Sequence, residues 1–329
     1  GESSGDMGRV ITAYRKFKFF GLYDLDTTPL YVLNARRVED GSTFQQEFLL
    51  EGETGNLKYT AGFFYLNLKN IQRPVATFGA PGPGNIDRFS VQETNSYAAY
   101  AQFTYALTDA LNLSAGARYT IDETSIDGQF VSTTGFPGGA GQVVARADSS
   151  FRVEKPTWRF AVDYKLTPDI LAYGSVSRGF KSGAYNNSSI TAEPTRPEIL
   201  DAYELGLKTE LLDRSVRFNI TSFLYDYKDL QIGAISLPNV LLVNAATAKV
   251  KGLEFELAAA PKLGEGTLNV ASTLALLDAK YKSFPNAPYF LPNPFTSVPP
   301  GFTCTVPSSA AGGGNTPWSF RASGKRMVR

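Results

Sequence analysis

The stretch from Tyr97 to Ile121, which reads YAAYAQFTYAL-TDA-LNLSAGARYTI, decides the fold. Apolar side chains recur at every second position on both sides of the tripeptide Thr108-Asp109-Ala110. Such alternation is typical of a β-strand with one apolar face, and a short polar segment between two alternating runs predicts an antiparallel hairpin. Each run has about eleven residues, roughly twice the length of an ordinary strand in a globular domain.

The same alternation recurs along the chain and gives about eleven strand candidates by template matching. With 30 glycines and 19 prolines, the sequence leaves little room for long helices. We therefore predict an all-β protein of long antiparallel strands. Besides the hairpin above, the regular runs are Trp158–Leu166, Tyr203–Leu211, Val216–Ile220, Leu253–Leu257 and Leu268–Leu276, and the less regular ones are Val10–Phe20, Thr43–Glu51, Leu57–Leu68 and Ile170–Lys181.

The expected connections alternate between short and long. Short turns are expected at Leu107–Leu111, Leu166–Ile170, Leu211–Ser215 and Ala260–Gly266, and long loops at Asp127–Ser150, Gly183–Ile199 and Ser283–Pro317. In a sheet of sequential strands, alternate connections lie at opposite ends. One end of the sheet is therefore predicted to have short turns and the other long loops. Long strands, this asymmetry and aromatic residues near the ends of apolar stripes are typical of a transmembrane antiparallel up-and-down β-barrel.

Alternation alone does not show which face of the sheet meets water. In a membrane barrel the apolar face meets lipid and the polar face lines the lumen, whereas in a soluble sandwich the apolar face forms the core. For the barrel we expect Ala101 and Leu113 to face lipid, and Gln102 and Ser114 to face the lumen. A soluble secreted β-protein that binds carbohydrate is the alternative from another class.

The composition excludes several classes of function. Lys and Arg number 32 against 31 Asp and Glu, and this balance argues against a nucleic-acid-binding protein. The sequence has no histidine, and Cys304 is its single cysteine. Imidazole catalysis, a histidine-ligated metal and a disulfide within the chain are therefore excluded. No run approaches the ~18 apolar residues of a membrane-spanning helix.

Two local patterns suggest nucleotide binding or catalysis. Ser175–Gly183 is rich in glycine, but its glycines lack the spacing of a GxxxxGK[ST] phosphate loop and no helical pattern follows. Glu254 and Glu256 share a face and could form a glycosidase pair, although ion pairing across a lumen wall explains them better. We predict that the chain is not an enzyme and holds no cofactor or metal.

An ordered set of motifs resembles the C-terminal barrel region of TonB-dependent outer-membrane receptors. The set runs from about Val10 to Tyr281 in the expected order. By this resemblance, residues 1–329 form one partial barrel domain, with a doubtful tail at 319–329. The motifs are Ile11–Arg15 (ITAYR), Phe44–Phe48 (FQQEF), Ala115–Tyr119 (AGARY), Tyr173–Gly183 (YGSVSRGFKSG), Pro197-Glu198, Tyr203–Lys208 (YELGLK), Phe223–Gln231 (FLYDYKDLQ) and Lys249–Leu257 (KVKGLEFEL).

The resemblance implies a protein of the bacterial outer membrane with a barrel of about twenty-two strands and a plug domain inside it. A plug segment contacts a TonB-type energy transducer, and such receptors import scarce nutrients, usually ferric siderophores. We expect this chain to be about half of such a receptor, without the plug domain and the closing strands. A passive outer-membrane porin or channel is the alternative within the barrel class.

The resemblance also indicates what the ligand contacts would be. A chelated ferric ion brings its own oxygen ligands, so the receptor recognises an organic surface and not the metal. Basic and aromatic groups near the long loops suit this task, and the candidates are Arg178, Lys181, Tyr185 and Arg196. The implied partners are outer-membrane lipid, a ferric siderophore or similar chelate, and the TonB-type transducer. Cys304 lies in the longest expected loop, either as a free thiol or bonded to another segment.

Overall fold

The computed structural model describes residues 6–24, 33–79, 86–133, 139–186, 190, 193–236, 239–283, 287–289 and 318–320. Within these ranges every regular element is a β-strand. No helix in this part of the chain is long and apolar enough to cross a membrane.

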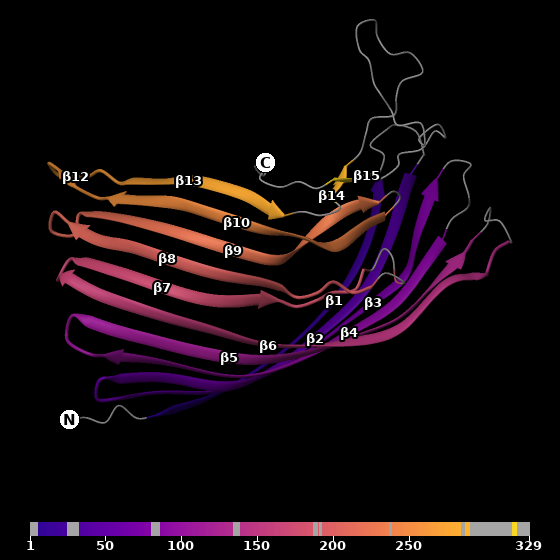
Figure 1. Ribbon diagram of the computed structural model, residues 1–329, viewed down its shortest axis with the longest axis horizontal. Coiled ribbons are helices and arrows are strands. Elements are labelled where there is room, and N and C mark those ends of the chain that lie inside the picture. Colours follow the sequence, from indigo (N-terminus) through magenta and orange to yellow (C-terminus); the bar gives the residue numbers. More distant parts are fainter. Residues whose placement is uncertain are drawn as a thin grey trace, which may run out of the picture.

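Eleven strands form one antiparallel sheet in which each strand pairs with its neighbours in the chain (Figure 1). The prediction of an all-β, up-and-down fold is confirmed. The strands are β1 (Met7–Asp24), β2 (Leu33–Thr54), β3 (Leu57–Gly79), β4 (Ile86–Ala106), β5 (Leu111–Ser132), β6 (Val143–Thr167), β7 (Ile170–Lys181), β8 (Glu198–Leu211), β9 (Val216–Ser236), β10 (Asn239–Ala259) and β13 (Val270–Ser283). Two short pairs lie outside this sheet: β11 (Lys262–Leu263) with β12 (Gly266–Thr267), and β14 (Ala287–Tyr289) with β15 (Trp318–Phe320).

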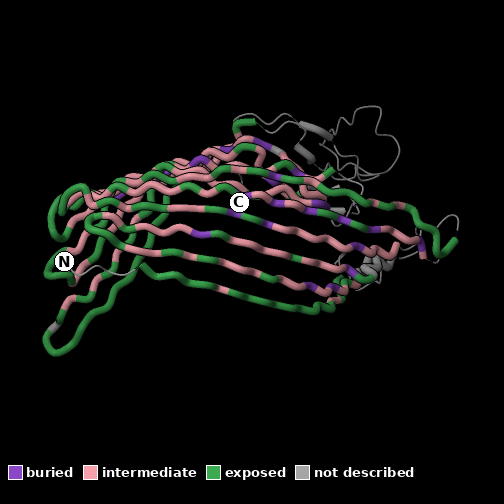
Figure 2. Tube along the Cα trace, turned by 90° about the horizontal axis from the view of Figure 1, so that it is seen from below, coloured by how far each residue is buried: buried purple, intermediate pink, exposed green. Residues whose placement is uncertain are grey.

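The sheet curves into an open, partial barrel whose two ends differ (Figures 1 and 2). At one end the chain reverses in tight turns, as predicted. The backbone amides of Ala110 and Leu111 bond the Thr108 hydroxyl in one of them. In another, Leu212, Asp213 and Arg214 take left-handed conformations with φ of 51°, 54° and 65°. We call this the tight-turn end and the other the long-connection end.

The predicted long loop at Asp127–Ser150 is wrong. β5 continues to Ser132 and β6 begins at Val143, and Asp127 pairs with Asp148 in the ladder between them. Strand β9 likewise continues to Ser236, far beyond the expected Val216–Ile220. The alternation misses these parts because only ~9–11 residues of a strand cross the hydrocarbon. The rest of a longer strand needs no apolar face. Residues 290–317 with Cys304, and residues 321–329, lie outside the described ranges.

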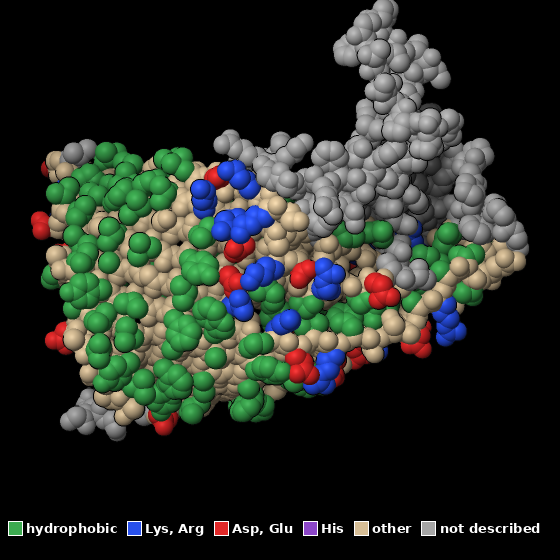
Figure 3. Space-filling model, in the orientation of Figure 1, with side chains coloured by type: hydrophobic (Ala, Val, Ile, Leu, Met, Phe, Trp, Pro, Cys, Tyr) green, Lys and Arg blue, Asp and Glu red, His purple; other side chains and the backbone are tan. Residues whose placement is uncertain are grey.

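The two faces of the sheet differ as the alternation predicts. We call the face that carries Ala101, Phe103 and Leu113 the outer face, and the opposite face the inner face. Outer-face side chains such as Phe103, Phe160 and Tyr203 are exposed. Figure 3 shows apolar side chains gathered over the half of the sheet near the tight turns. On the inner face the hydroxyls of Thr104 and Ser114 bond each other at 2.9 Å.

The assignment of the faces predicts opposite responses to a charge placed at neighbouring positions. Ala101→Arg and Leu113→Arg put a guanidinium on the outer face and should lower stability in a bilayer by ~2–4 kcal/mol near the midplane. Gln102→Arg and Ser114→Arg, at the same height on the inner face, serve as matched controls and should change stability little. The measurement is the free energy of unfolding of the complete receptor in lipid vesicles. An equal change in the free energy of unfolding for both pairs would contradict the assignment of the two faces.

Candidate functional site

The inner face is a polar wall held by hydrogen bonds between strands. Near the long-connection end, the side-chain amide of Gln72 donates to Glu39 at 2.8 Å. The hydroxyls of Thr94 and Thr124 lie 3.1 Å apart on neighbouring strands. Gln72, Glu39 and Thr124 are buried. Buried polar groups that bond one another are held in fixed positions, so this wall is a rigid lining.

Tyrosine rings cover glycines on the same face. The Tyr100 hydroxyl donates to Glu47 at 2.6 Å across the strand that carries Gly62. A Cβ on Gly62 would come 2.6 Å from that hydroxyl oxygen and 2.7 Å from the backbone carbonyl oxygen of Phe48, so the close approach requires glycine. The Arg118 guanidinium lies 5.4 Å from the centre of the Tyr100 ring. The wall therefore presents aromatic and charged groups side by side.

The described part of the connection between β7 and β8 folds back over the inner face, and we call its residues 182–186, 190 and 193–197 the inner segment. Its Tyr185 and Ile190 are buried in one apolar cluster with Ile126 of β5. Phe151 of β6 packs against this cluster, with its ring centre 5.1 Å from that of Tyr185. The Ser149 hydroxyl donates to the Tyr185 hydroxyl at 2.9 Å. One side of the inner segment is thus anchored on β5 and β6.

The other side of the inner segment is anchored on β9 and β10 by amide side chains. Asn186 donates to the Leu242 carbonyl at 3.0 Å and accepts from the Leu242 amide at 2.5 Å. Asn244 accepts from the Arg196 amide at 2.6 Å and donates to the Arg196 carbonyl at 2.8 Å. Gln231 donates to the carbonyls of Ser182 and Arg196. The inner segment therefore reaches across the inner face between strands that are not adjacent.

The two arms of the inner segment lie side by side. The Ala184 amide donates to the Thr195 hydroxyl at 3.0 Å, and the Thr195 amide donates to the Ala184 carbonyl at 2.9 Å. A Cβ on Gly183 would come 2.2 Å from the Thr195 carbonyl oxygen. Any other residue at position 183 would push the arms apart.

The structure does not bring the four predicted ligand-contact residues together. Lys181 is exposed at the end of β7, and Arg196 is exposed in an ion pair with Asp229 at 2.6 Å. Tyr185 is buried in the apolar cluster. Whether these residues contact a ligand stays a prediction.

Arg178 lies apart from the other three candidates. It is in register with Trp158 and Asp201, two positions from Val176 and on the same outer face. Its guanidinium bonds Asp201 at 2.6 Å and lies 5.9 Å from the Trp158 ring centre. Sequence reasoning overlooked the anchoring roles of Asn186, Gln231 and Asn244, because amide side chains in polar loops carry no distinctive pattern.

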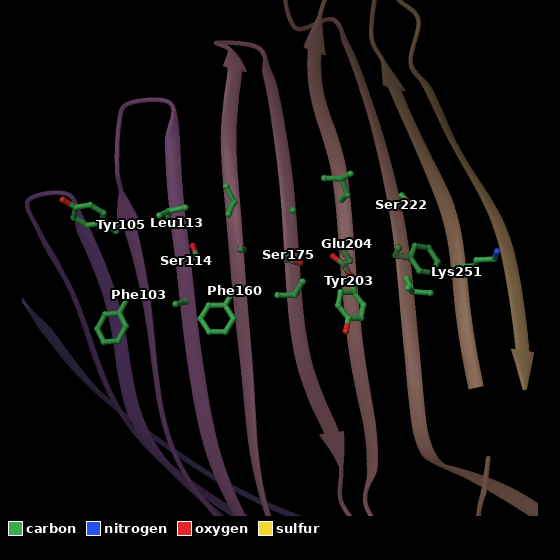
Figure 4. A pocket seen from close by; sticks show the side chains of 18 residues that line it. Phe103, Tyr105, Leu113, Ser114, Phe160, Ser175, Tyr203, Glu204, Ser222 and Lys251 are labelled. Atoms are coloured by element: carbon green, nitrogen blue, oxygen red, sulfur yellow. The ribbon is translucent and has the colours of Figure 1, made fainter. Parts of the chain in front are cut away.

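A shallow depression of about 1010 Å³ lies on the outer face (Figure 4). Phe103, Phe160 and Tyr203 border it, and the small residues Gly174 and Ser222 lie among them. Because this face carries the exposed apolar side chains, the depression suits an apolar occupant and not a water-soluble chelate. Among the described residues, no three His, Cys, Asp or Glu side chains gather to hold a metal ion.

Comparison with known proteins agrees with this architecture. The family model described as TonB dependent receptor-like, beta-barrel matches residues 8–318. The pesticin receptor of Yersinia pestis is 28% identical over 162 residues, which cover 48% of this chain and 23% of that protein. The ferric yersiniabactin uptake receptor FyuA from Yersinia pestis has a TM-score of 0.70 and 19% identity, over 84% of this chain and 40% of that chain. The siderophore receptor PiuA from Acinetobacter baumannii has a TM-score of 0.63 and 17% identity, over 86% of this chain and 45% of that chain.

These relatives are considerably longer than the present chain, which spans less than half the length of each of them. At such low identities the two solved structures establish the fold alone.

Loss of the Asn186 side chain should release the inner segment. Asn186→Ala leaves the half-buried amide and carbonyl of Leu242 without the Asn186 side chain as partner, which costs ~1–3 kcal/mol. We expect hydrogen exchange at the amides of Ala184 and Thr195 to become about tenfold faster or more. Asn219→Ala is the control, because Asn219 bonds only Glu256 near the tight-turn end among the contacts described. Unchanged exchange in Asn186→Ala would contradict the anchoring role.

Proposed function

The chain belongs to the TonB-dependent receptor β-barrel family, and on that premise we propose that it forms about half of a receptor for energy-coupled uptake of a scarce nutrient. The nutrient we propose is a ferric siderophore or a similar chelate, and the energy source is a TonB-type transducer. The protein is a β-barrel of the bacterial outer membrane, as its family and fold indicate. The observation that supports uptake most is the inner segment folded over a polar inner wall.

The outer face argues against the soluble alternative. It exposes aromatic and branched side chains on β3, β4, β6 and β8, including Phe63, Phe103, Phe160 and Leu205, which are between 47% and 68% exposed. A soluble protein rarely leaves so large an apolar area uncovered. In a bilayer the same area is solvated by lipid chains.

Closure of the barrel follows from the edges of the sheet. Among the described strands, β1 and β13 each pair on one side only. Unpaired backbone groups cost several kcal/mol each in hydrocarbon, so an open sheet does not span a membrane. We propose that further strands, about as many again, close the barrel, and that a plug domain with its transducer-contact segment completes the receptor.

The inner segment offers a ligand-contact surface at the long-connection end. Arg196 is 69% exposed while its backbone is fixed by Asn244, so the guanidinium is presented on a rigid support. Lys181 precedes the segment and is exposed too. We propose that these two cations meet an anionic chelate and that buried Tyr185 positions them. Arg178 is not part of this proposal, because its guanidinium bonds Asp201 on the outer face.

Uptake should require energy. In a strain that lacks the complete receptor, the plasmid-borne gene should restore accumulation of a radiolabelled ferric siderophore drawn from a panel of catecholate, hydroxamate and mixed types. Collapse of the proton-motive force should stop accumulation but leave surface binding intact. A passive porin predicts accumulation that continues without the proton-motive force. If the gene restores accumulation of none of the chelates but does restore accumulation of another scarce nutrient, the siderophore assignment is refuted and the receptor function is retained.

Removal of Arg196 should weaken ligand binding without unfolding the barrel. Arg196→Ala should raise the Kd of the accepted chelate about tenfold or more, because a hydrogen bond to a charged group contributes ~1.5–3 kcal/mol. Arg214→Ala is the matched control: Arg214 is likewise an exposed arginine in an ion pair, with Glu210 at 3.2 Å, but it lies at the tight-turn end. Equal Kd values for both variants would rule out a direct contact.

A further inference from the structure

Six charged side chains of β9, β10 and β13 form a compact group on the sheet, which we call the lysine cluster. Asp226 contacts Lys249 at 3.7 Å and Lys282 at 3.2 Å. Asp278 contacts Lys251 at 3.8 Å and Lys280 at 3.0 Å. Four lysines therefore surround two aspartates, which leaves a net charge of +2 within the group.

The register places the lysine cluster on the outer face. Lys251 pairs with Leu224 and Asp278, and two residues further along β10 Leu253 pairs with Ser222 and Leu276. Because side chains alternate between faces, Lys251 shares a face with Leu253 and with the exposed Leu276. The direction of β10 puts Lys249 and Lys251 on the long-connection side of this apolar area. Figure 3 shows basic and acidic side chains just beyond the apolar half of the sheet.

The lysine cluster adjoins the apolar depression. Lys251 is one of the residues that line it, together with Leu224 and Tyr203 (Figure 4). A neighbouring group on the same face, Arg178, Lys228 and Asp201, adds one further positive charge. Apolar volume and positive charge are therefore adjacent at one place on the outer face.

This juxtaposition fits one chemical class of ligand. Long connections lie outside the cell in barrels of the outer membrane, so the cluster is at the level of the outer-leaflet headgroups. Lysines at this level extend towards the interface and attract anionic headgroups, at about 1 kcal/mol for each basic residue. We propose that the lysine cluster and the depression together bind a phosphorylated lipid of the outer leaflet, with phosphate at the lysines and acyl chains along the depression.

The two aspartates explain how the site keeps its shape without the lipid. Asp226 of β9 holds one lysine of β10 and one of β13, and Asp278 of β13 holds one lysine of β10 and one of its own strand, all at 3.0–3.8 Å. These contacts limit like-charge repulsion. An incoming phosphate meets ammonium groups that are already grouped. The bound lipid then links β9, β10 and β13 on the outer face.

The test measures binding of diphosphoryl lipid A to the complete receptor in a neutral detergent, by native mass spectrometry. Lys249→Gln with Lys251→Gln removes two charges while each aspartate keeps one lysine. The affinity should fall roughly 25-fold, at about fivefold for each lysine. Lys249→Arg with Lys251→Arg should bind like the unmodified receptor. Asp226→Asn should bind more tightly, because it adds one net positive charge.

The matched control combines Lys155→Gln with Lys208→Gln, which change two lysines on the inner face. It should leave the affinity for lipid A unchanged.

Three results would overturn the proposal. The first is unchanged affinity in the folded Lys249→Gln, Lys251→Gln variant. The second is an equal loss in the inner-face control, which would show attraction by net charge alone. The third is displacement of lipid A by inorganic phosphate at equal concentration, which would identify a site for free phosphate and not for a lipid headgroup.

Discussion

Every part of this molecule depends on the requirement that backbone N–H and C=O groups pair inside a bilayer. Hydrocarbon offers no alternative partner, so a strand that crosses it must bond along its whole length on both sides. The ladders meet this requirement with registers that run unbroken over long distances, as between β4 and β5 from Ile86 to Ala106. The irregularities in β10, between Asn244 and Ala248, lie near the long-connection end. They coincide with the place where the inner segment bonds β10 through Asn244.

A continuous ladder fixes which side chains lie on each face of the sheet, so the two faces can differ in polarity. Apolar side chains on the outer face stabilise the protein through lipid contact, so the inner face is free to be polar. Many of its hydroxyl, amide and carboxylate groups bond one another, as Gln72 and Glu39 illustrate. The inner segment can then attach to this wall with only a small apolar cluster around Tyr185 and a few amide hydrogen bonds.

The parts of the fold that cross the hydrocarbon could be predicted from the sequence, and the parts beyond it could not. Period-two alternation located the hairpin around Thr108–Ala110 because lipid demands an apolar face there. It failed at Asp127–Ser150, where the strands continue beyond the hydrocarbon and the outer face carries polar residues such as Asp127 and Asp148. The same alternation would have placed Arg178 beside Val176 on the outer face, but a basic residue near a loop suggested ligand contact instead. Asn186 bonds Leu242, which is 56 residues away, and no local pattern predicts a contact of that range.

The order of the strands has a consequence for how the sheet is assembled. Every strand of the eleven-stranded sheet pairs with the next strand of that sheet along the chain, and at the tight-turn end β2–β3, β4–β5, β6–β7 and β8–β9 are joined by only a few residues. The entropy cost of closing each hairpin is therefore small, and contacts that are local in sequence favour rapid formation. The sheet can grow by one hairpin at a time, with its most recent strand as the template for the next. By the same logic, gain or loss of a single hairpin during evolution would widen or narrow the wall by two strands and leave every other register intact.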